Sequence, residues 1–416
     1  MKRLLLSLLT GVTIGTSLLS AQEIEKSITI TADGQKEEID LPQGMVSTTD
    51  SLYLDWISKH YINPAENCTT SEQNPQVSDS IYMDRLKRIP AIIEMPYNKI
   101  VREFIDMYAT RLRQKVAFML SANNFYMPIF EEALDLYDLP LELKYLPVIE
   151  SALNPMATSP QGATGLWQFM LRTGQVYGLK VNSLVDERRD PIKSTRAAAR
   201  YLKDLYDIYH DWNLVLAAYN CGPGTINKAI RRAGGETDFW SIYNYLPKAT
   251  RGYVPAFIAA NYIMTYYCEH YISPMEMRMP ESTDTVHVSR PLNLNQVAEV
   301  CKINIDELRA MNPEFKKDII PGNEKPYALR LPSNMVSKFI DKEDSIYSYK
   351  SDVYLTRRAT VDVKGSSTGK PVYHRIRNGE TLGGIAARYG VSVKQLRRLN
   401  GIKGSNIRAG KSLRIR

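Results

Sequence analysis

The stretch from Leu146 to Met170, LPVIESALNPMATSPQGATGLWQFM, decides the fold and carries the chemistry of this 416-residue chain. Its one acidic residue, Glu150, follows an apolar run. Apolar surroundings disfavour the charged form of a carboxyl group and therefore raise its pKa. A carboxylic acid that stays protonated near neutral pH can protonate a glycosidic oxygen. Glu150 is the first candidate catalytic residue, although a lone Glu beside apolar residues more often sits at a helix end and reaches solvent.

The residues after Glu150 favour close contact with a sugar. Small and turn-forming residues are frequent between Asn154 and Gly165, and they allow the backbone to approach a bulky ligand. Trp167, Gln168 and Phe169 follow, offering an aromatic face and an amide suited to N-acetyl groups.

The region around this stretch is predicted to be mainly helical. Apolar residues recur there at helical spacing, and capping residues mark several helix starts. Pro147 should kink or shorten its helix, because proline lacks an amide donor. Glu142 is expected on the surface of that helix. We expect helices over 101–120, from the cap Asp138 to the Asn154-Pro155 pair, over 194–209, from the cap Asp211 to Asn220, and over about 255–267.

Beyond residue 275 the chain repeats itself. Residues 285–331 parallel residues 372–415, and each copy is predicted to form strand, helix, helix and strand in about 45 residues. The polar stretch 334–370, which ends in GSSTG, is typical of a linker between the copies.

Residues 95–275 resemble the lytic transglycosylases of the goose-lysozyme-like superfamily, and most of all the membrane-bound lytic murein transglycosylase D group. The resemblance implies a mainly α lysozyme-like catalytic domain that cleaves peptidoglycan. The motifs that carry it, in order, are Glu150-Ser151, Asn154-Pro155, Gly162-Ala163, Gly165-Leu166-Trp167-Gln168, Tyr177-Gly178-Leu179, Asp190-Pro191, Ala217-Ala218-Tyr219-Asn220 and Tyr253-Val254-Pro255.

The same resemblance assigns roles to five residues. Glu150 matches the catalytic acid and base, while Ser159 and Gln168 match residues that position the sugar. Tyr219 and Asn220 match a pair facing the carboxylate, with Tyr219 orienting Glu150 or the substrate by a hydrogen bond. Trp167 is expected to pack in the core rather than stack on sugar.

The resemblance also implies how one carboxylate suffices. Glu150 protonates the oxygen between N-acetylmuramic acid (MurNAc) and N-acetylglucosamine (GlcNAc), and the C6 hydroxyl of the muramic acid then closes a 1,6-anhydro ring. A lysozyme-like hydrolase would need a second carboxylate. Asp186, Glu187 and Asp190 are the candidates, although a salt-bridged helix start is the expected interpretation. A non-catalytic glycan-binding scaffold is the third hypothesis.

The repeats resemble LysM modules, small α+β (βααβ) units that bind glycans containing N-acetylglucosamine. The resemblance places a sugar groove on the second copy, residues 371–416, near Gly379, Thr381, Leu382 and Ile407. The first copy, residues 283–333, lacks the Gly-Glu-Thr turn. It is expected to fold as a degenerate module that binds glycan weakly.

Charge and the N-terminus indicate the compartment. Residues 1–21 have a basic start, an apolar run and a small-residue cleavage site, as in a signal peptide. Residues 22–94 are polar and irregular, typical of an extended N-terminal arm. The net charge is +8, and residues 371–416 hold eleven Lys and Arg against one acid. In the periplasm or cell envelope the partner of such a basic module is anionic peptidoglycan, not nucleic acid. An uncleaved signal that holds the protein at the membrane is the alternative.

The remaining chemistry is sparse. The histidines show no HExxH pattern, and there is no GxSxG turn or phosphate-binding glycine loop. We therefore expect no metal and no cofactor. The four cysteines, Cys68, Cys221, Cys268 and Cys301, allow three disulfide pairings, and buried free thiols are at least as expected. Cys221 is interpreted as a small buried filler.

Overall fold

The computed structural model divides into two compact units, residues 1–173 with 191–279 and residues 174–190 with 280–416. The predicted signal peptide, residues 1–21, lies outside the described residues. The structure describes residues 26–32, 35–46, 68, 71, 73–275, 280, 282–356, 373–376, 380–389, 393–402, 404 and 407–415.

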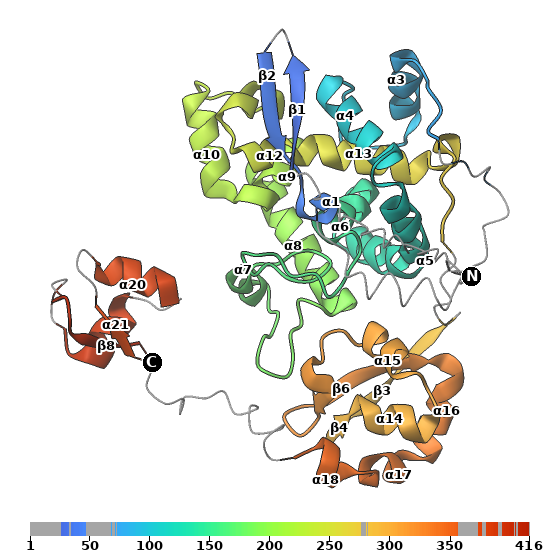
Figure 1. Ribbon diagram of the computed structural model, residues 1–416, viewed down its shortest axis with the longest axis vertical. Helices are drawn as coiled ribbons and strands as arrows, with labels where there is room; N and C mark the ends of the chain where they lie inside the picture. Colours follow the sequence, from blue (N-terminus) through green and yellow to red (C-terminus); the bar gives the residue numbers. More distant parts are fainter. Residues whose placement is uncertain are drawn as a thin grey trace, which may run out of the picture. The chain divides into compact units, whose positions relative to one another are not determined.

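The first unit is helical, and α13 (Tyr253–Thr265) lies at its centre (Figure 1). Every α13 residue from Tyr253 to Met264 is buried, because the helix contacts neighbours on all sides. The surrounding elements are α3 (Asp79–Arg88), α4 (Lys99–Ala109), α5 (Arg113–Leu136), η1 (Leu141–Tyr145), α6 (Leu146–Ser151), α8 (Pro191–Tyr209), α9 (Trp212–Cys221), α10 (Pro223–Arg232), α11 (Phe239–Ile242), η2 (Tyr243–Tyr245), α12 (Lys248–Arg251) and η3 (Cys268–His270). The short helix α7 (Leu171–Val176) contains the boundary between the units.

Several predicted helix boundaries are wrong. The single helix expected over 101–120 is two helices, α4 and α5, separated at Thr110, whose backbone leaves the helical region. Asp138 is not an N-cap, since its φ is +53°. Of the two outcomes expected for Pro147, shortening is the one found: α6 begins only at Leu146, and Pro147 stands in its first turn, where its missing amide costs nothing. The Asp211 cap is confirmed, because its carboxylate accepts from the Leu214 amide at 2.7 Å.

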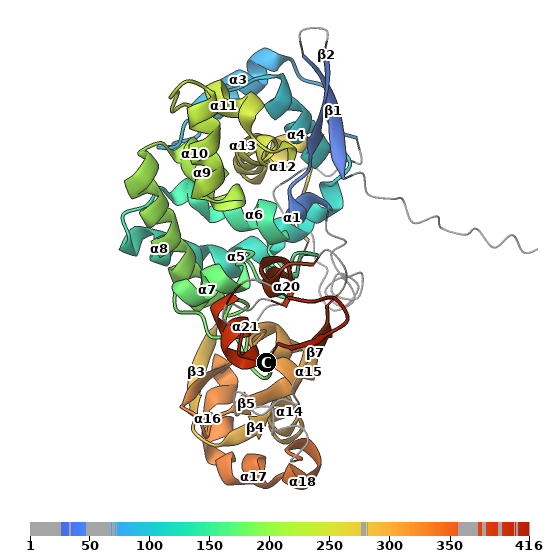
Figure 2. The ribbon, with the colours of Figure 1, turned by 90° about the vertical axis from the view of Figure 1, so that its left-hand side faces the viewer.

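Residues 26–46 are not the irregular arm that their polar composition indicates. They form an antiparallel hairpin, β1 (Ser27–Ala32) with β2 (Gln35–Asp40), followed by the short helix α1 (Gln43–Val46). Ile39 and Met45 are fully buried because β2 packs on α12 and α1 packs on α6 (Figure 2). We call residues 26–46 the N-terminal strap.

A disulfide joins Cys68 to Cys268, just beyond the end of α13. This pairing links two residues 200 positions apart, and spacing alone did not select it. Cys221 and Cys301 are free. Both keep raised thiol pKa values because they are partly or fully buried, which agrees with Cys221 as a filler.

The second unit contains both predicted repeats, and their strand–helix–helix–strand order is confirmed. In the first, the terminal strands β3 and β6 pair antiparallel, with Val286 opposite Leu329. The second has the same plan with shorter strands. The first copy holds β3 (Thr283–Val288), β4 (Pro291–Asn293), α14 (Leu294–Cys301), α15 (Ile305–Met311), η4 (Lys316–Asp318), β5 (Ile319–Pro321) and β6 (Tyr327–Pro332); the second holds β7 (Tyr373–Arg375), α20 (Leu382–Tyr389), α21 (Val393–Asn400) and β8 (Ser412–Arg414).

The linker predicted over 334–370 is wrong in its first half. Three helices follow β6: α16 (Ser333–Asp341), α17 (Glu343–Ser348) and α18 (Ser351–Tyr354). Phe339, Ile346 and Tyr347 from this stretch enter the core of the first repeat. Polar residues outnumber these apolar ones in the stretch, so its composition gave no sign of packed helices. Residues 357–370 lie outside the described part of the chain.

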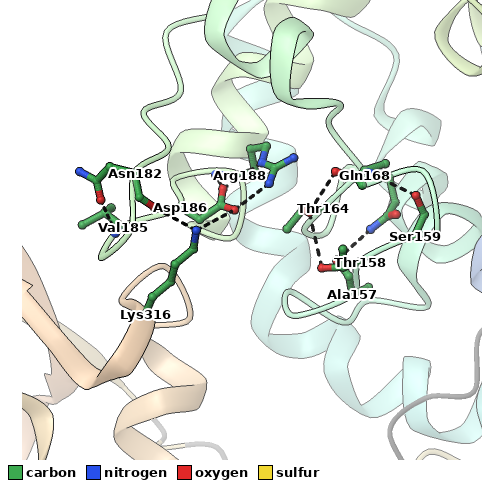
Figure 3. A network of polar contacts seen from close by, with 12 residues as sticks. Ala157, Thr158, Ser159, Thr164, Gln168, Asn182, Val185, Asp186, Arg188 and Lys316 are labelled. Carbon is green, nitrogen blue, oxygen red and sulfur yellow. Dashed lines mark hydrogen bonds and ion pairs between the residues drawn. The ribbon is translucent and has the colours of Figure 1, made fainter. Parts of the chain in front are cut away.

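The core of the first repeat also takes residues from far upstream in the sequence. Leu184 and Val185, from the segment Gly174–Asp190, are fully buried in it. Val185 forms a β-bridge with Phe315, and the amine of Lys316 donates to the Asn182 carbonyl at 3.0 Å (Figure 3). The repeat is therefore completed by a segment about a hundred residues before it.

In the part of the chain that the structure describes, no helix combines the length and the apolar character that crossing a bilayer requires.

Replacing Leu184 by Ala should destabilise the second unit. A buried Leu→Ala change removes apolar contact and leaves a cavity, which costs about 2–5 kcal/mol. Scanning calorimetry of residues 22–416 should show a lower melting temperature for the transition of this unit. Val353→Ala is the matched control, because Val353 is 61% exposed in the same unit. Equal melting temperatures for the two variants would contradict the packing described.

Candidate active site

Glu150 lies near the end of α6, a helix whose residues are all buried. Only 9% of its surface is exposed. Burial raises the pKa of its carboxyl group from 4.5 to about 7, and a hydrogen bond from Tyr253 opposes part of this rise. No other carboxylate among the described residues contributes to the shift. With a pKa of about 7, Glu150 keeps a large protonated fraction near neutral pH, as the apolar run before it predicted.

Tyr253 is the partner of Glu150. It is the first residue of α13, and its hydroxyl donates to Glu150 Oε1. Its own pKa is raised well above the usual value by burial and by the negative charge of Glu150, so it stays a protonated donor. Tyr253 belongs to one of the family motifs, but the resemblance implied no role for it. A buried tyrosine a hundred residues away carries no local signal that it meets a carboxyl group.

Helix α6 ends abruptly and hands the chain to a compact loop. Ala152 and Leu153, both fully buried, take left-handed backbone conformations with φ of +51° and +60°. Such conformations are uncommon outside glycine and are kept only where the surroundings enforce them. The Ser151 hydroxyl holds the turn by donating to the Leu166 carbonyl at 2.9 Å. The left-handed turn and the Ser151 hydrogen bond together fix the end of α6, and with it the backbone at Glu150.

The loop from Ala157 to Phe169 is a small folded platform (Figure 3). Isolated β-bridges pair Thr164 with both Thr158 and Phe169. The Gly165 amide donates to the Ala157 carbonyl at 2.9 Å, and Gly165 has a φ of +89° that favours glycine. The small residues that sequence analysis assigned to sugar contact therefore also build this tight fold.

Ser159 and Gln168, the two predicted sugar-positioning residues, belong to this platform. The Ser159 hydroxyl accepts from the Ala163 amide at 3.1 Å. The Gln168 side-chain nitrogen donates to the carbonyls of Gly165 and Ala157, at 2.8 and 3.2 Å. Its side-chain oxygen finds no hydrogen-bond partner within the described residues. Gln168 thus keeps a buried acceptor without a partner among the described residues, whereas Ser159 is engaged in the loop.

The predicted pair Tyr219 and Asn220 ends α9 but does not hydrogen-bond to Glu150. The Tyr219 hydroxyl donates to the Trp167 carbonyl at 2.8 Å, and the Asn220 side-chain oxygen accepts from Thr250 at 2.9 Å. The alternative in which Tyr219 orients Glu150 is therefore corrected, because Tyr253 has that place. Burial and the charge of Glu150 raise the pKa of Tyr219, so the two groups are within electrostatic reach.

Aromatic rings line this part of the unit. Tyr219 lies 5.2 Å from Tyr201 and 6.5 Å from Phe169 between ring centroids. Trp167 is fully buried, and its indole nitrogen donates to Thr195 at 2.9 Å. The expectation that Trp167 packs in the core is confirmed.

Two of the carboxylates considered for activating a water are engaged within the second unit. Burial works against ionisation of Asp186, but Arg188 at 2.7 Å and Lys316 outweigh it and lower its pKa (Figure 3). Glu187 accepts from the Lys180 amide at 2.8 Å and pairs with Lys325 at 3.3 Å. The ion-paired interpretation of these two residues is confirmed.

Glu142 is not on the surface. Only 7% of it is exposed, and one of its carboxylate oxygens accepts from the amides of Ile92 and Ile93. It ties the segment before α4 to η1, a contact between residues about 50 positions apart that helical spacing does not reveal.

The predicted LysM groove is only partly described. Thr381 is exposed, and its hydroxyl accepts from the Gly384 amide at 3.1 Å. Ile407 is half-buried against the core of the module. Leu382 is 2% exposed and belongs to that core, so its assignment to the groove is corrected. Gly379 lies outside the described residues.

Comparison with known proteins identifies three domains in the chain. Residues 127–241 match the transglycosylase SLT domain, residues 282–348 the lytic transglycosylase MltD LysM-like domain, and residues 374–416 the LysM domain. The chain thus carries one SLT domain and two LysM-type domains. The segment Gly174–Asp190, which completes the core of the LysM-like domain, lies within the SLT match.

Curated relatives of this chain include membrane-bound lytic murein transglycosylases. Membrane-bound lytic murein transglycosylase D of Escherichia coli strain K12 is 33% identical over 287 residues, covering 67% of this chain and 60% of the relative. Membrane-bound lytic murein transglycosylase F of Serratia proteamaculans is 33% identical over 168 residues, covering 35% of this chain and 33% of the relative. The chain therefore spans about 60% of the former relative's length.

Among solved structures, the 70 kDa soluble lytic transglycosylase from Escherichia coli matches with 25% identity and a TM-score of 0.30. The match covers 36% of this chain and 25% of that one.

Replacing Tyr253 by Phe should raise the pKa of Glu150 further above 7. The hydroxyl stabilises the charged carboxylate, and a hydrogen bond to a charged group contributes about 1.5–3 kcal/mol, or roughly one to two pKa units. Carboxyl-carbon NMR titration, with Glu150→Gln to assign the signal, measures the shift. Tyr108→Phe is the control, because the buried Tyr108 hydroxyl has no partner within the described residues. An unchanged pKa in Tyr253→Phe would refute the assigned contact.

Proposed function

We propose that this chain is a peptidoglycan lytic transglycosylase that cleaves the MurNAc-β-1,4-GlcNAc bond and leaves 1,6-anhydroMurNAc ends. The observation that carries the proposal is the buried Glu150, a lone carboxyl group with a pKa of about 7 and a tyrosine as its partner. The SLT match and the relatives named lytic murein transglycosylases support the same reaction.

The geometry suits a reaction in which one group serves as acid and then as base. Protonated Glu150 gives its proton to the glycosidic oxygen, and the bond to the muramic acid C1 breaks. The carboxylate left behind is stabilised by the Tyr253 hydroxyl. The sugar's own C6 hydroxyl then bonds to C1, and Glu150 takes the proton back. No water enters, and the acid is regenerated for the next cycle.

An intramolecular nucleophile also explains why a single carboxylate is enough. The C6 hydroxyl is already in place, so no second group is needed to position and activate a water. This agrees with the absence of any other carboxylate among the described residues that perturbs Glu150. The hydrolase hypothesis would instead need Asp186 or Asp190 to supply the base.

The second unit is proposed to hold the enzyme on its substrate. The LysM match over residues 374–416 and the excess of basic residues there support attraction to the anionic wall. Ser159, Gln168, Tyr219 and Asn220 remain proposed substrate-positioning residues. Export to the cell envelope follows from the same substrate, since peptidoglycan lies outside the inner membrane.

Digestion of purified peptidoglycan by residues 22–416 should release muropeptides that end in 1,6-anhydromuramic acid. Mass spectrometry identifies them, because each is one water lighter than its hydrolysed counterpart. Glu150→Gln should lower the rate at least about 10²-fold, the low end for losing a general acid. It should still sediment with insoluble peptidoglycan, since the LysM module is unchanged.

Other products would redirect the assignment. Ordinary reducing ends would mean that a water is activated and would support the hydrolase. No products from folded, wall-bound wild-type protein would support the scaffold.

A further inference from the structure

The N-terminal strap contacts the segments that carry Glu150 and Tyr253 at two glycines, Gly44 and Gly252. Gly44, in α1, lies against the backbone of α6. A Cβ atom on Gly44 would stand 2.5 Å from the Val148 carbonyl oxygen and 2.6 Å from that of Ile149. Real Cβ atoms do not come this close to backbone, so a side chain at Gly44 requires α6 to shift. The contact falls directly before Glu150.

The second glycine lies on the other side of the Glu150–Tyr253 hydrogen bond. Gly252 directly precedes Tyr253, and a Cβ there would stand 2.6 Å from the Asp40 carbonyl oxygen in the strap. It would also stand 2.9 Å from a methyl group of Ile39. The end of β2 therefore packs closely against Gly252, directly before Tyr253, the first residue of α13.

Polar contacts hold the strap in this place. The amine of Lys115, on α5, donates to the carbonyls of Gly44 and Met45, each at 3.1 Å. The guanidinium of Arg251 pairs with Glu37 at 2.6 Å. These contacts fix α1 from the α5 side and β2 from the α12 side.

We propose that the N-terminal strap is a positioning element of the active site, which sets the separation between the Glu150 carboxyl group and the Tyr253 hydroxyl through its backbone contacts at Gly44 and Gly252. This inference rests on the proposed function. The strap touches no reacting atom, so Gly44 and Gly252 are positioning residues rather than catalytic ones.

The physical reason is that both contacts are backbone against backbone. Packed interiors do not deform freely, and a misplacement of about 1 Å at a catalytic group can cost 10²-fold in rate. A strap that merely covered apolar surface would add stability without affecting the distance between two particular side chains. The two glycines place its contacts at the residues flanking the catalytic pair.

The test compares Gly44→Ala and Gly252→Ala in residues 22–416, with Thr29→Ala as a control on the exposed face of the same hairpin. Each glycine variant should lower kcat at least about tenfold with little change in KM. Because Glu150 must be protonated to act, the rate falls as pH rises through its pKa. A weaker bond from Tyr253 raises that pKa, so this limb of the kcat/KM profile should move to higher pH.

The Tyr253→Phe background separates positioning from general destabilisation. If the glycine contacts act through Tyr253, adding Gly44→Ala or Gly252→Ala to Tyr253→Phe should move the limb no further. A full additional shift, or wild-type kcat and an unmoved limb in folded single variants, would overturn the proposal.

Failure of the proposed function can be told apart from failure of the strap proposal. Absence of anhydro products from wild-type protein means that the proposed function fails, whatever the variants do. If the glycine variants do not fold, Lys115→Met replaces them, since it removes the two hydrogen bonds that hold the Gly44 and Met45 carbonyls against α5. Wild-type kcat and an unmoved pH limb in folded Lys115→Met would then overturn the proposal.

Discussion

The hydrogen bond between the buried side chains of Tyr253 and Glu150 is the contact on which the rest of the first unit depends. Burial alone would push the carboxyl group towards a permanently neutral state, and a strong cation would hold it ionised. One tyrosine hydroxyl lies between these extremes and leaves a pKa of about 7. Both side chains are buried, with Tyr253 1% and Glu150 9% exposed.

Several contacts of the first unit fix two short pieces of backbone, α6 and the start of α13. Left-handed residues end α6, the Ser151 hydroxyl ties it to the platform loop, and the N-terminal strap presses on it from outside. The second unit also depends on contacts between residues that are distant in the sequence. Its LysM-like domain is completed by Leu184 and Val185, which lie inside the SLT match. The sequence boundaries of these domains are therefore not the boundaries of their cores.

What could be predicted from sequence was local or periodic. The apolar run before Glu150 foretold its burial, Asp211 was recognisable as a cap, and the repeated pattern predicted both small modules. What could not be predicted depends on contacts between distant residues. Glu142 follows a surface pattern but is buried under the amides of Ile92 and Ile93. Composition marked the N-terminal strap as polar, although Ile30, Ile39 and Met45 are buried in it. Tyr253 gained its role only when α13 was placed beside α6.

The central claim is that Glu150 is held protonated near neutral pH by burial, and the pH dependence of stability tests it most directly. The folded pKa, about 7, lies above the ordinary 4.5, so the folded state binds the proton more tightly and loses this advantage as pH rises between those values. Glu150→Gln does not titrate. Its unfolding free energy relative to wild type should therefore rise by about 3 kcal/mol from pH 4.5 to pH 8. The tryptophans among the described residues, Trp167, Trp212 and Trp240, all lie in the first unit, so denaturant unfolding followed by tryptophan fluorescence reports on it. A difference between the two proteins that stays constant over this range would contradict the account.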